Sequence, residues 1–248
     1  MVVTNFLEHV GKFSSMLVRM FSKPENKKVY WKELMHQSND IGIRSLPIIS
    51  IISVFLGAVM TVMTAYQLVS PLIEKYVMAQ VVRDSVILEL SPTINSIVLA
   101  GVVGSKIASE LGNMRVSEQI DALEIMGINT KSYLVFPKIM SAFIMVPLLI
   151  ILSIFLSLFG GYITVMFTSI MSTEQYLYGL EEGFMEFNIL VALVKSFVYA
   201  FLISSISSYY GYHVKGGALE IGRASTTAVV VTCIMILLAD YIITMLML

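Results

Sequence analysis

Long stretches without a single charged residue recur along the chain, and they constrain its fold more than any other feature. These stretches cover residues 45–73, 90–105, 139–173, 196–214 and 224–239. An α-helix needs about 20 mainly apolar residues to cross a bilayer core, and the shorter stretches reach this length when one ionisable residue is admitted. Only 13% of all residues are charged, whereas ordinary soluble domains contain about 25%. The sequence therefore predicts an all-α polytopic membrane protein.

We expect one domain over residues 1–248, with basic residues concentrated in alternate connecting segments. The five predicted spans cover residues 46–69, 86–104, 139–168, 189–211 and 225–248. Thirteen of the 16 lysines and arginines lie in residues 1–44, 106–138 and 215–223. Segments rich in these residues stay on the cytoplasmic side of a membrane. The N-terminus is therefore predicted to be cytoplasmic and the C-terminus to lie on the outer side.

The N-terminal region, residues 1–44, has its own pattern. Apolar residues recur every three or four positions over residues 2–21, with charged residues between them. This spacing predicts an amphipathic helix that lies in the membrane interface and does not cross it. Pro24 is expected to end this helix, and Tyr30 and Trp31 suit the level of the lipid headgroups.

A short polar segment, residues 117–127, separates the second and third spans. Ser117 is a candidate N-cap and Gly127 a candidate end of a helix. One stripe of this helix is acidic (Glu118, Asp121 and Glu124), and the stripe beside it is apolar (Ile120, Leu123 and Met126). Such a helix either fits a groove on a partner protein or lies on the cytoplasmic face of its own chain. The residues leave both alternatives open.

Lys195 and Asp240 are ionisable residues inside the fourth and fifth predicted spans. Such residues are costly in a membrane and usually face a partner or a wet cavity. Both lie roughly 9–12 Å below the outer surface, from the rise of an α-helix, so we expect them to pair or to share a polar network. The pair either only locks the helices together or, with Glu89, serves as an ion or proton relay. The chain shows no paired inverted repeat, which counts against the relay of a secondary transporter.

Several ordered motifs resemble the signature of one family. They are GxxGSxxASELGxMRxSEQIDALExMGI at 101–128, LVFPK at 134–138, GGA at 216–218, GRASTTAVV at 222–230, ADY at 239–241 and AYQL at 65–68. Together they resemble the MlaE (YrbE-type) permeases of Mla/Mce ABC lipid transporters. The resemblance implies a permease subunit, with no catalytic activity of its own, that forms a homodimer in the bacterial inner membrane. It also implies a cytoplasmic ABC ATPase dimer, a periplasmic ring of Mce-domain proteins and a phospholipid or related lipid as cargo.

The resemblance further implies roles for particular residues. Segment 117–127 corresponds to the coupling helix that sits in the ATPase groove, with Ser117, Glu118, Ile120, Asp121, Leu123, Glu124, Met126 and Gly127 as its candidate residues. Glu89 lies near the family's lipid cavity, and Tyr66 and Gln67 are further cavity candidates. Many members have Arg-Glu-Leu-Gly-Pro around this glutamate, where this chain has Leu88 and Ser91. The missing arginine weakens the expectation that this site grips a phosphate.

The sequence provides no site for ATP, for a metal or for catalysis. It contains no GxxxxGK[ST] motif, so ATP and Mg²⁺ must be bound by a partner chain. Its three histidines lie in separate segments and, with Cys233 as the one cysteine, make no metal-ligand spacing. We expect no cofactor in this chain and no nucleic-acid partner. An intramembrane enzyme acting on lipids is a further alternative, but no nucleophile and base occur at a recognisable spacing.

Overall fold

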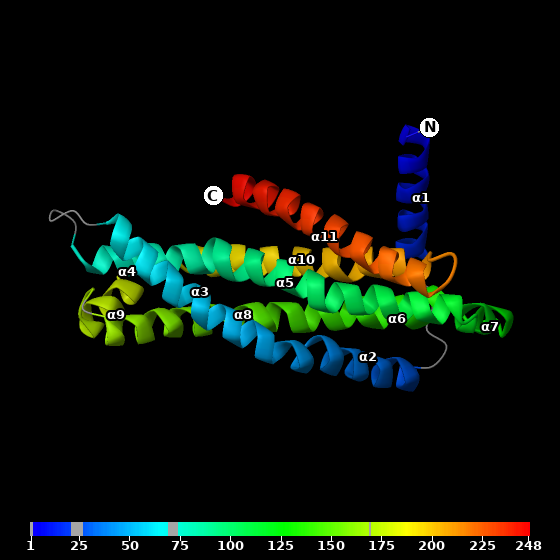
Figure 1. Ribbon diagram of the computed structural model, residues 1–248, viewed down its shortest axis with the longest axis horizontal. Helices are drawn as coiled ribbons and strands as arrows, with labels where there is room; N and C mark the ends of the chain where they lie inside the picture. Colours follow the sequence, from blue (N-terminus) through cyan, green and yellow to red (C-terminus); the bar gives the residue numbers. More distant parts are fainter. Residues whose placement is uncertain (1, 21–26, 69–73, 169) are drawn as a thin grey trace. The chain divides into compact units, whose positions relative to one another are not determined.

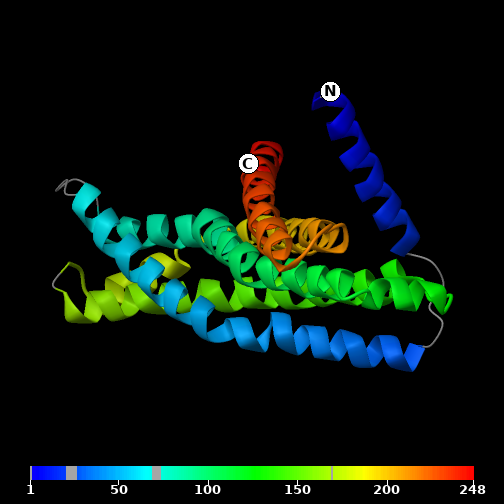
Figure 2. The same cartoon turned by 45° about the vertical axis from the view of Figure 1, so that its right-hand side comes forward.

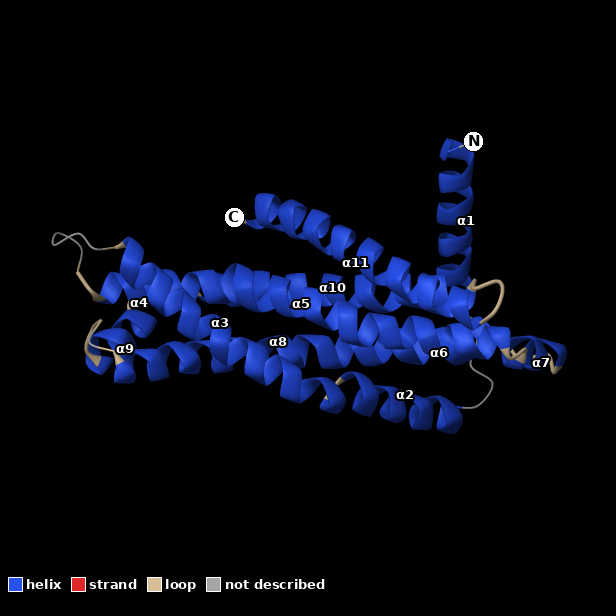
Figure 3. Cartoon of the chain, in the orientation of Figure 1, coloured by secondary structure: helices blue, strands red, loops and turns tan. Residues whose placement is uncertain are grey.

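A computed structural model describes residues 2–20, 27–68, 74–168 and 170–248. Within these ranges the chain forms helices and no strand (Figures 1 and 3). The α-helices are α1 (Val2–Met20), α2 (Lys27–Ile41), α3 (Leu46–Gln67), α4 (Tyr76–Ser85), α5 (Asn95–Leu99), α6 (Ser105–Val116), α7 (Gln119–Ile125), α8 (Phe136–Phe167), α9 (Thr173–Glu181), α10 (Glu186–Tyr212) and α11 (Ala218–Met247). A short 3₁₀-helix, η1 (Ile43–Ser45), joins α2 to α3, and three π-helical segments are η2 (Val86–Ile94), η3 (Ala100–Gly104) and η4 (Lys131–Val135).

Among the described residues, five helical segments are long and apolar enough to cross a membrane. They are Lys28–Gln67, Tyr76–Val116, Lys131–Phe167, Glu186–Tyr212 and Ala218–Met247. The predicted number of spans is therefore confirmed. Each helix extends beyond the predicted span at one end at least, because helical backbone continues past the apolar residues that the prediction counted.

Three helices were not predicted from the sequence. Helix α2, drawn in blue in Figure 2, is followed in the sequence by η1 and then by α3. Helix α4 begins the second segment at Tyr76, ten residues before the predicted start at Val86, and α9 lies between the third and fourth segments. The charged side chains of these helices hid them from a hydropathy-based prediction. Pro24, Val69 and the side chains of Val2, Val3 and Phe6, which entered the predictions, lie outside the described residues.

The chain divides into two compact units. Unit 1 comprises the described residues of Met1–Arg44, Leu99–Met145 and Ala200–Ile236. Unit 2 comprises those of Ser45–Val98, Val146–Tyr199 and Leu237–Leu248. Each unit is therefore assembled from three separate parts of the sequence.

Helix α6 is held in unit 1 by ion pairs and by close packing. Lys106 Nζ lies 2.6 Å from Asp40 Oδ2 of α2, and Glu110 Oε2 lies 2.7 Å from Lys138 Nζ of α8. On α10, a Cβ atom added to Gly211 would lie 2.6 Å from the carbonyl oxygen of Ala108. Helices α6 and α10 approach this closely only because position 211 has no side chain.

Unit 2 uses glycine in the same way. A Cβ atom on Gly57 of α3 would overlap the backbone of Ser157 on α8, and one on Gly160 would overlap the carbonyl of Val54. Gly57 and Gly160 thus let the backbones of α3 and α8 come into contact.

A buried arginine closes the end of α9 in unit 2. The Arg83 guanidinium is buried and donates to the carbonyl oxygens of Leu180 at 3.0 Å and Glu182 at 2.8 Å. Unsatisfied carbonyls at a helix C-terminus carry a partial negative charge that favours a cation. Arg83 thereby fixes α9 on α4, beside a small core formed by Met78, Ala79, Val165, Met171 and Tyr176.

Candidate functional site

The predicted coupling helix is present as α7, but it begins differently from the prediction. Ser117 ends α6, and its hydroxyl group donates to the carbonyl oxygen of Asn113 at 2.7 Å. Glu118 has a φ of 59° and therefore lies in the left-handed region, and α7 begins at Gln119. The prediction of Ser117 as N-cap is wrong, because its side chain bonds backwards into the preceding helix.

The end of α7 agrees with the sequence. Gly127 has a φ of 82°, which glycine adopts without steric cost. Its N–H donates to the carbonyl oxygen of Glu124 at 3.0 Å, and the N–H of Ile128 donates to that of Leu123 at 3.1 Å. These bonds satisfy carbonyls that would otherwise lack a partner at the helix end.

Two carboxylates of the acidic stripe bind partners within unit 1. Asp121 Oδ1 lies 2.6 Å from Arg115 Nη1 of α6. Glu124 Oε1 accepts from the hydroxyl groups of Tyr212 at 2.7 Å and Thr130 at 3.0 Å. The hydrogen bond from Tyr212 lowers the pKa of Glu124 below its ordinary value. Asp121 and Glu124 therefore fix α7 on its own chain, a role that the sequence did not indicate.

The ring of Tyr212 is the centre of this arrangement. Arg115 Cζ lies 6.0 Å and Lys131 Nζ 5.7 Å from the ring centroid, distances at which a cation is attracted to the π face. The Tyr212 hydroxyl also lies 2.7 Å from that of Thr130. We call Arg115, Asp121, Glu124, Thr130 and Tyr212 the α7 latch, since together they tie α7 to α6 and α10.

The apolar stripe of α7 is divided between the interior and the surface. Ile120 is fully buried in unit 1, so it is not available to a partner protein. Met126 and Ile125 are exposed, Ile125 to 88%. Sequence reasoning missed Ile125, because a strict three-residue repeat was extended over a helix of only seven residues. Leu123 is half-buried, so the exposed apolar surface at the end of α7 is formed by Ile125 and Met126.

A second polar site lies in unit 2, around Lys195 of α10. Its ammonium group is fully buried and lies 2.7 Å from Asp240 Oδ1 of α11 and 2.8 Å from Glu89 Oε1 of η2. It also donates to the carbonyl oxygen of Leu88 at 2.9 Å. The structure thus brings the Lys195–Asp240 pair together with Glu89, which the sequence named both as a cavity candidate and as a third member of a possible relay.

Two hydroxyl groups complete this site. Tyr199 donates to Asp240 Oδ1 at 2.7 Å, and Thr244 donates to Glu89 Oε1 at 3.2 Å. Neither tyrosine nor threonine was singled out from the sequence, although Tyr199 follows Lys195 by one helical turn. We call Glu89, Lys195, Tyr199, Asp240 and Thr244 the Lys195 cluster. One cation faces two carboxylates here, so the cluster repels a phosphate and is suited to neutral or cationic groups.

The remaining cavity candidates lie elsewhere in unit 2. Tyr66 and Gln67 occupy the last turn of α3, and both are exposed. The structure does not join them to the Lys195 cluster by any described contact. Glu89 itself is 43% exposed on its side chain, so one edge of the cluster is open.

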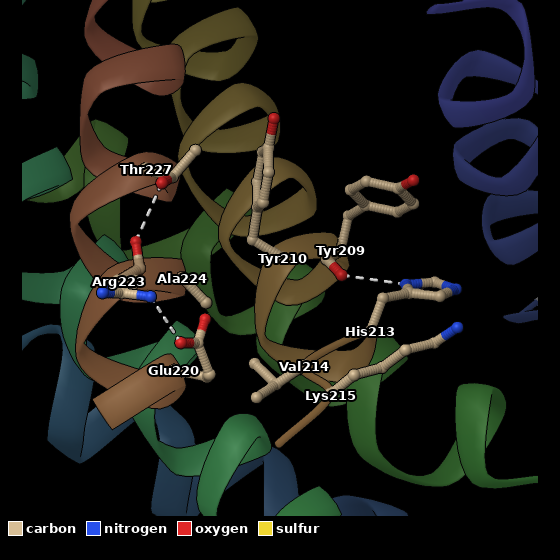
Figure 4. A pocket seen from close by; sticks show the side chains of 9 residues that line it. All are labelled: Tyr209, Tyr210, His213, Val214, Lys215, Glu220, Arg223, Ala224 and Thr227. Carbon is tan, nitrogen blue, oxygen red and sulfur yellow. Dashed lines mark hydrogen bonds and ion pairs between the residues drawn. The ribbon is translucent and has the colours of Figure 1, made fainter. Parts of the chain in front are cut away.

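The GRA motif at 222–224 borders a pocket in unit 1 of about 260 Å³ (Figure 4). Its lining includes Tyr210, His213, Lys215 and Arg223. Arg223 pairs with Glu220 at 2.7 Å, and Arg223 and Lys215 are directed to opposite sides in Figure 4. Burial is the main cause that lowers the pKa of His213, and this favours the neutral ring. The cations around this pocket therefore do not converge on one ligand.

Metal binding finds no support in the described part of the chain, where no three His, Cys, Asp or Glu side chains are grouped to hold an ion. The exposed end of α7 and the Lys195 cluster are two features with functional potential.

Comparison with known proteins places these features in context. The model of the family described as Permease MlaE matches residues 34–246. A probable ABC transporter permease protein of Rickettsia bellii is 35% identical, with 96% of this chain and 91% of that protein covered. A probable ABC transporter permease protein of Synechocystis is 30% identical, over 87% of this chain and 82% of that protein. The chloroplastic protein Trigalactosyldiacylglycerol 1 of Arabidopsis thaliana is 29% identical, over 87% of this chain and 61% of that protein.

Proposed function

Because this chain belongs to the MlaE permease family, we propose that it moves phospholipid or a related lipid between the inner membrane and the periplasmic side. It is the permease subunit of an ABC transporter, as the related permeases indicate. The energy for transport comes, in this proposal, from ATP hydrolysis by a separate cytoplasmic subunit, because the chain lacks a P-loop.

The observation that carries the ATPase partner is the exposed end of α7. Ile125, the last residue of α7, and Met126, its C-cap, present two exposed apolar side chains, while the α7 latch holds the helix on α6 and α10. Single exposed apolar residues need no explanation, but two neighbours on a rigidly held polar helix suit insertion into a groove on another protein. A latched helix can also transmit a displacement, because it cannot move without the residues that hold it.

Lipid as cargo is supported by the name of one relative and by the open Lys195 cluster. The Arabidopsis relative is named after trigalactosyldiacylglycerol, a galactolipid. The Lys195 cluster carries a net negative charge, which fits the departure of Leu88 from the family's arginine and argues against a phosphate grip there. In our proposal Glu89, with Tyr66 and Gln67 as further candidates, borders the path of the lipid.

We further propose the assembly that the family resemblance implies. It comprises two copies of this chain, two ATPase subunits that bind ATP and Mg²⁺, and a ring of periplasmic Mce-domain proteins. The membrane is the bacterial inner membrane, with the N-terminus in the cytoplasm and the C-terminus in the periplasm, in line with the distribution of basic residues. The chain itself has no enzymatic activity in this proposal.

The ATPase contact is tested by the variant Ile125→Glu/Met126→Glu in the complex purified with its ATPase subunit. We expect the ATPase to be lost on purification, or ATP hydrolysis to become independent of lipid. The matched control is Leu219→Glu, which places a charge at an exposed leucine on α11 in the other basic segment. Unchanged co-purification together with unchanged lipid-stimulated hydrolysis would rule out this role of α7.

The cargo and its energy source are tested in proteoliposomes with a fluorescent phospholipid. We expect movement of the lipid that depends on ATP and persists without an ion gradient. The clustering of Lys195, Glu89 and Asp240 is the one observation that favours the alternative, a secondary transporter with an intramembrane relay. Transport by the chain alone under a proton gradient, without ATP, would establish that alternative.

A further inference from the structure

One face of helix α2 packs against other residues of unit 1. The Tyr30 hydroxyl lies 2.9 Å from that of Ser132, and the Tyr30 ring meets Tyr133 edge to face with centroids 6.2 Å apart. The Ser141 hydroxyl donates to the carbonyl oxygen of Leu34 at 2.9 Å. Gln37 and Ile41 are buried on the same face. These contacts fix the rotation of α2 about its axis, and they therefore also determine which of its residues point away from unit 1.

The other face of α2 borders a groove with a cavity volume of about 600 Å³. Its lining is formed by Lys28, Val29, Lys32, Glu33, His36 and Tyr133. Lys28, Lys32 and His36 recur every four residues and therefore form one line along the helix. The Cβ atoms of successive members of such a line are about 5–6 Å apart. Glu33 is the one carboxylate in this lining, and its Oε1 accepts from Gln37 Nε2 at 2.9 Å.

Apolar side chains accompany this basic line. Trp31 is 63% exposed and Met35 is also exposed, although α2 contains only 15 residues. Tryptophan is enriched where a protein meets lipid headgroups. Helix α2 begins the segment Lys28–Gln67, whose apolar part is α3. The basic line therefore lies directly before the apolar part of a membrane-spanning segment.

We propose that the α2 groove binds the phosphate headgroup of an anionic phospholipid from the cytoplasmic leaflet. Lys28 and Lys32 attract the phosphate, while Val29 and the ring of Tyr133 contact the apolar part of the lipid. Basic pockets at the cytoplasmic ends of membrane helices recognise anionic headgroups in this way. This lipid is a bound partner of unit 1 and not the cargo. The proposal rests on the cytoplasmic placement of the N-terminal region and not on ATP-driven transport.

Trp31 provides the test, because it is the only tryptophan in the chain. The full chain is purified in detergent and titrated with mixed micelles that contain phosphatidylglycerol or, separately, phosphatidylcholine. We expect a saturable change of Trp31 fluorescence with phosphatidylglycerol and a much weaker one with phosphatidylcholine. The variant Lys28→Gln/Lys32→Gln should bind phosphatidylglycerol about 30-fold more weakly.

Two further variants separate this site from general surface charge and from misfolding. Lys28→Arg/Lys32→Arg keeps both charges and should restore binding. Lys75→Gln/Lys215→Gln removes the same two charges at exposed positions outside the groove and should leave binding unchanged. If this control weakens binding as much as the groove variant, or if the arginine variant fails to restore it, the proposal is wrong.

Two other occupants are outcomes of the same experiment. If inorganic phosphate or glycerol 3-phosphate changes Trp31 fluorescence with the same affinity as phosphatidylglycerol, the groove binds a soluble anion and the lipid proposal is overturned. If the Lys28→Gln/Lys32→Gln variant binds phosphatidylglycerol normally but loses the ATPase subunit on co-purification, the groove is a protein interface. Because the titration uses neither ATP nor a partner, its failure would leave the proposed transport function standing.

Discussion

The hydroxyl group of Tyr212, the last residue of α10, donates a hydrogen bond of 2.7 Å to Glu124 in α7. The two residues are 88 positions apart in the sequence. This bond connects the end of a membrane-spanning helix directly to the helix that we propose as the ATPase contact. The α7 latch therefore requires residues of α6 and α10 and is not formed by the 117–127 segment alone.

Removal of the Tyr212 hydroxyl group should loosen α7. A hydrogen bond to a charged group contributes about 1.5–3 kcal/mol, so we expect Tyr212→Phe to lower the local stability of α7 by roughly this amount. Hydrogen exchange of residues 119–126 measures the effect, with Tyr241→Phe, an exposed tyrosine of α11, as control. In the complex, lipid moved per ATP should fall. Exchange as slow as in the wild type would show that the bond does not hold α7.

The latch should also depend on pH in a defined direction. The pKa of Glu124 is lowered from 4.5, with the hydrogen bond from Tyr212 as the largest cause. A lowered folded-state pKa means that the stabilisation is present above pH 4.5 and is lost as the pH falls through the folded-state value. We expect the difference in α7 protection between the wild type and Glu124→Gln to shrink below that pH. A difference that stays constant from pH 7 to pH 3 would contradict the assignment.

Loss of the cation from the Lys195 cluster should be strongly destabilising. Lys195→Met leaves Glu89 and Asp240 without a counter-ion, and breaking a buried ion pair in this way costs about 3–5 kcal/mol. The triple variant Glu89→Gln/Lys195→Met/Asp240→Asn carries no uncompensated charge and should recover much of this loss. Unfolding in detergent measures both variants, and Lys75→Met at an exposed position is the control. A triple variant no more stable than the single one would show that charge balance is not the cause.

Close packing of α3 on α8 should not tolerate a methyl group. Gly57→Ala places a Cβ against the backbone of Ser157, so the helices must separate, which we expect to cost about 1–3 kcal/mol or to prevent folding. Gly222→Ala is the matched control, because no atom lies within 4 Å of its Cβ position. The control should be neutral or slightly stabilising. Thermal unfolding of the two purified variants measures the difference. Equal stabilities would contradict the role of Gly57 in the packing of α3 on α8.

Much of the fold was predictable from local pattern. The five spans were found because apolar length alone decides whether a helix can cross a bilayer, and the end of α7 was found because Gly127 provides a left-handed φ. The start of α7 was missed, since Ser117 can cap a following helix or bond back to the preceding one. Only the backbone geometry of Glu118 distinguishes these alternatives.

The candidate sites were less predictable, because their contacts join distant segments. Lys195 and Asp240 could be matched by their depth in the membrane, but for Glu89, which is 106 residues from Lys195, the sequence left open whether it joins this pair or lines a separate cavity. Likewise, Asp121 and Glu124 had the appearance of a surface stripe until their partners Arg115 and Tyr212 were known. The sequence around a charged residue does not show whether its partner belongs to the same chain or to another protein.

The sequence by itself determined that this chain has five segments long and apolar enough to cross a membrane, that it has no ATP-binding motif and that it carries the family's ordered motifs. These properties depend on apolar length and on residue identity, which are local. Only the tertiary structure decided which side of α7 is free, which residues surround Lys195 and where α2 forms a basic groove. These properties depend on which side chains of different helices come into contact. Only the packing of the helices sets the distances between such side chains.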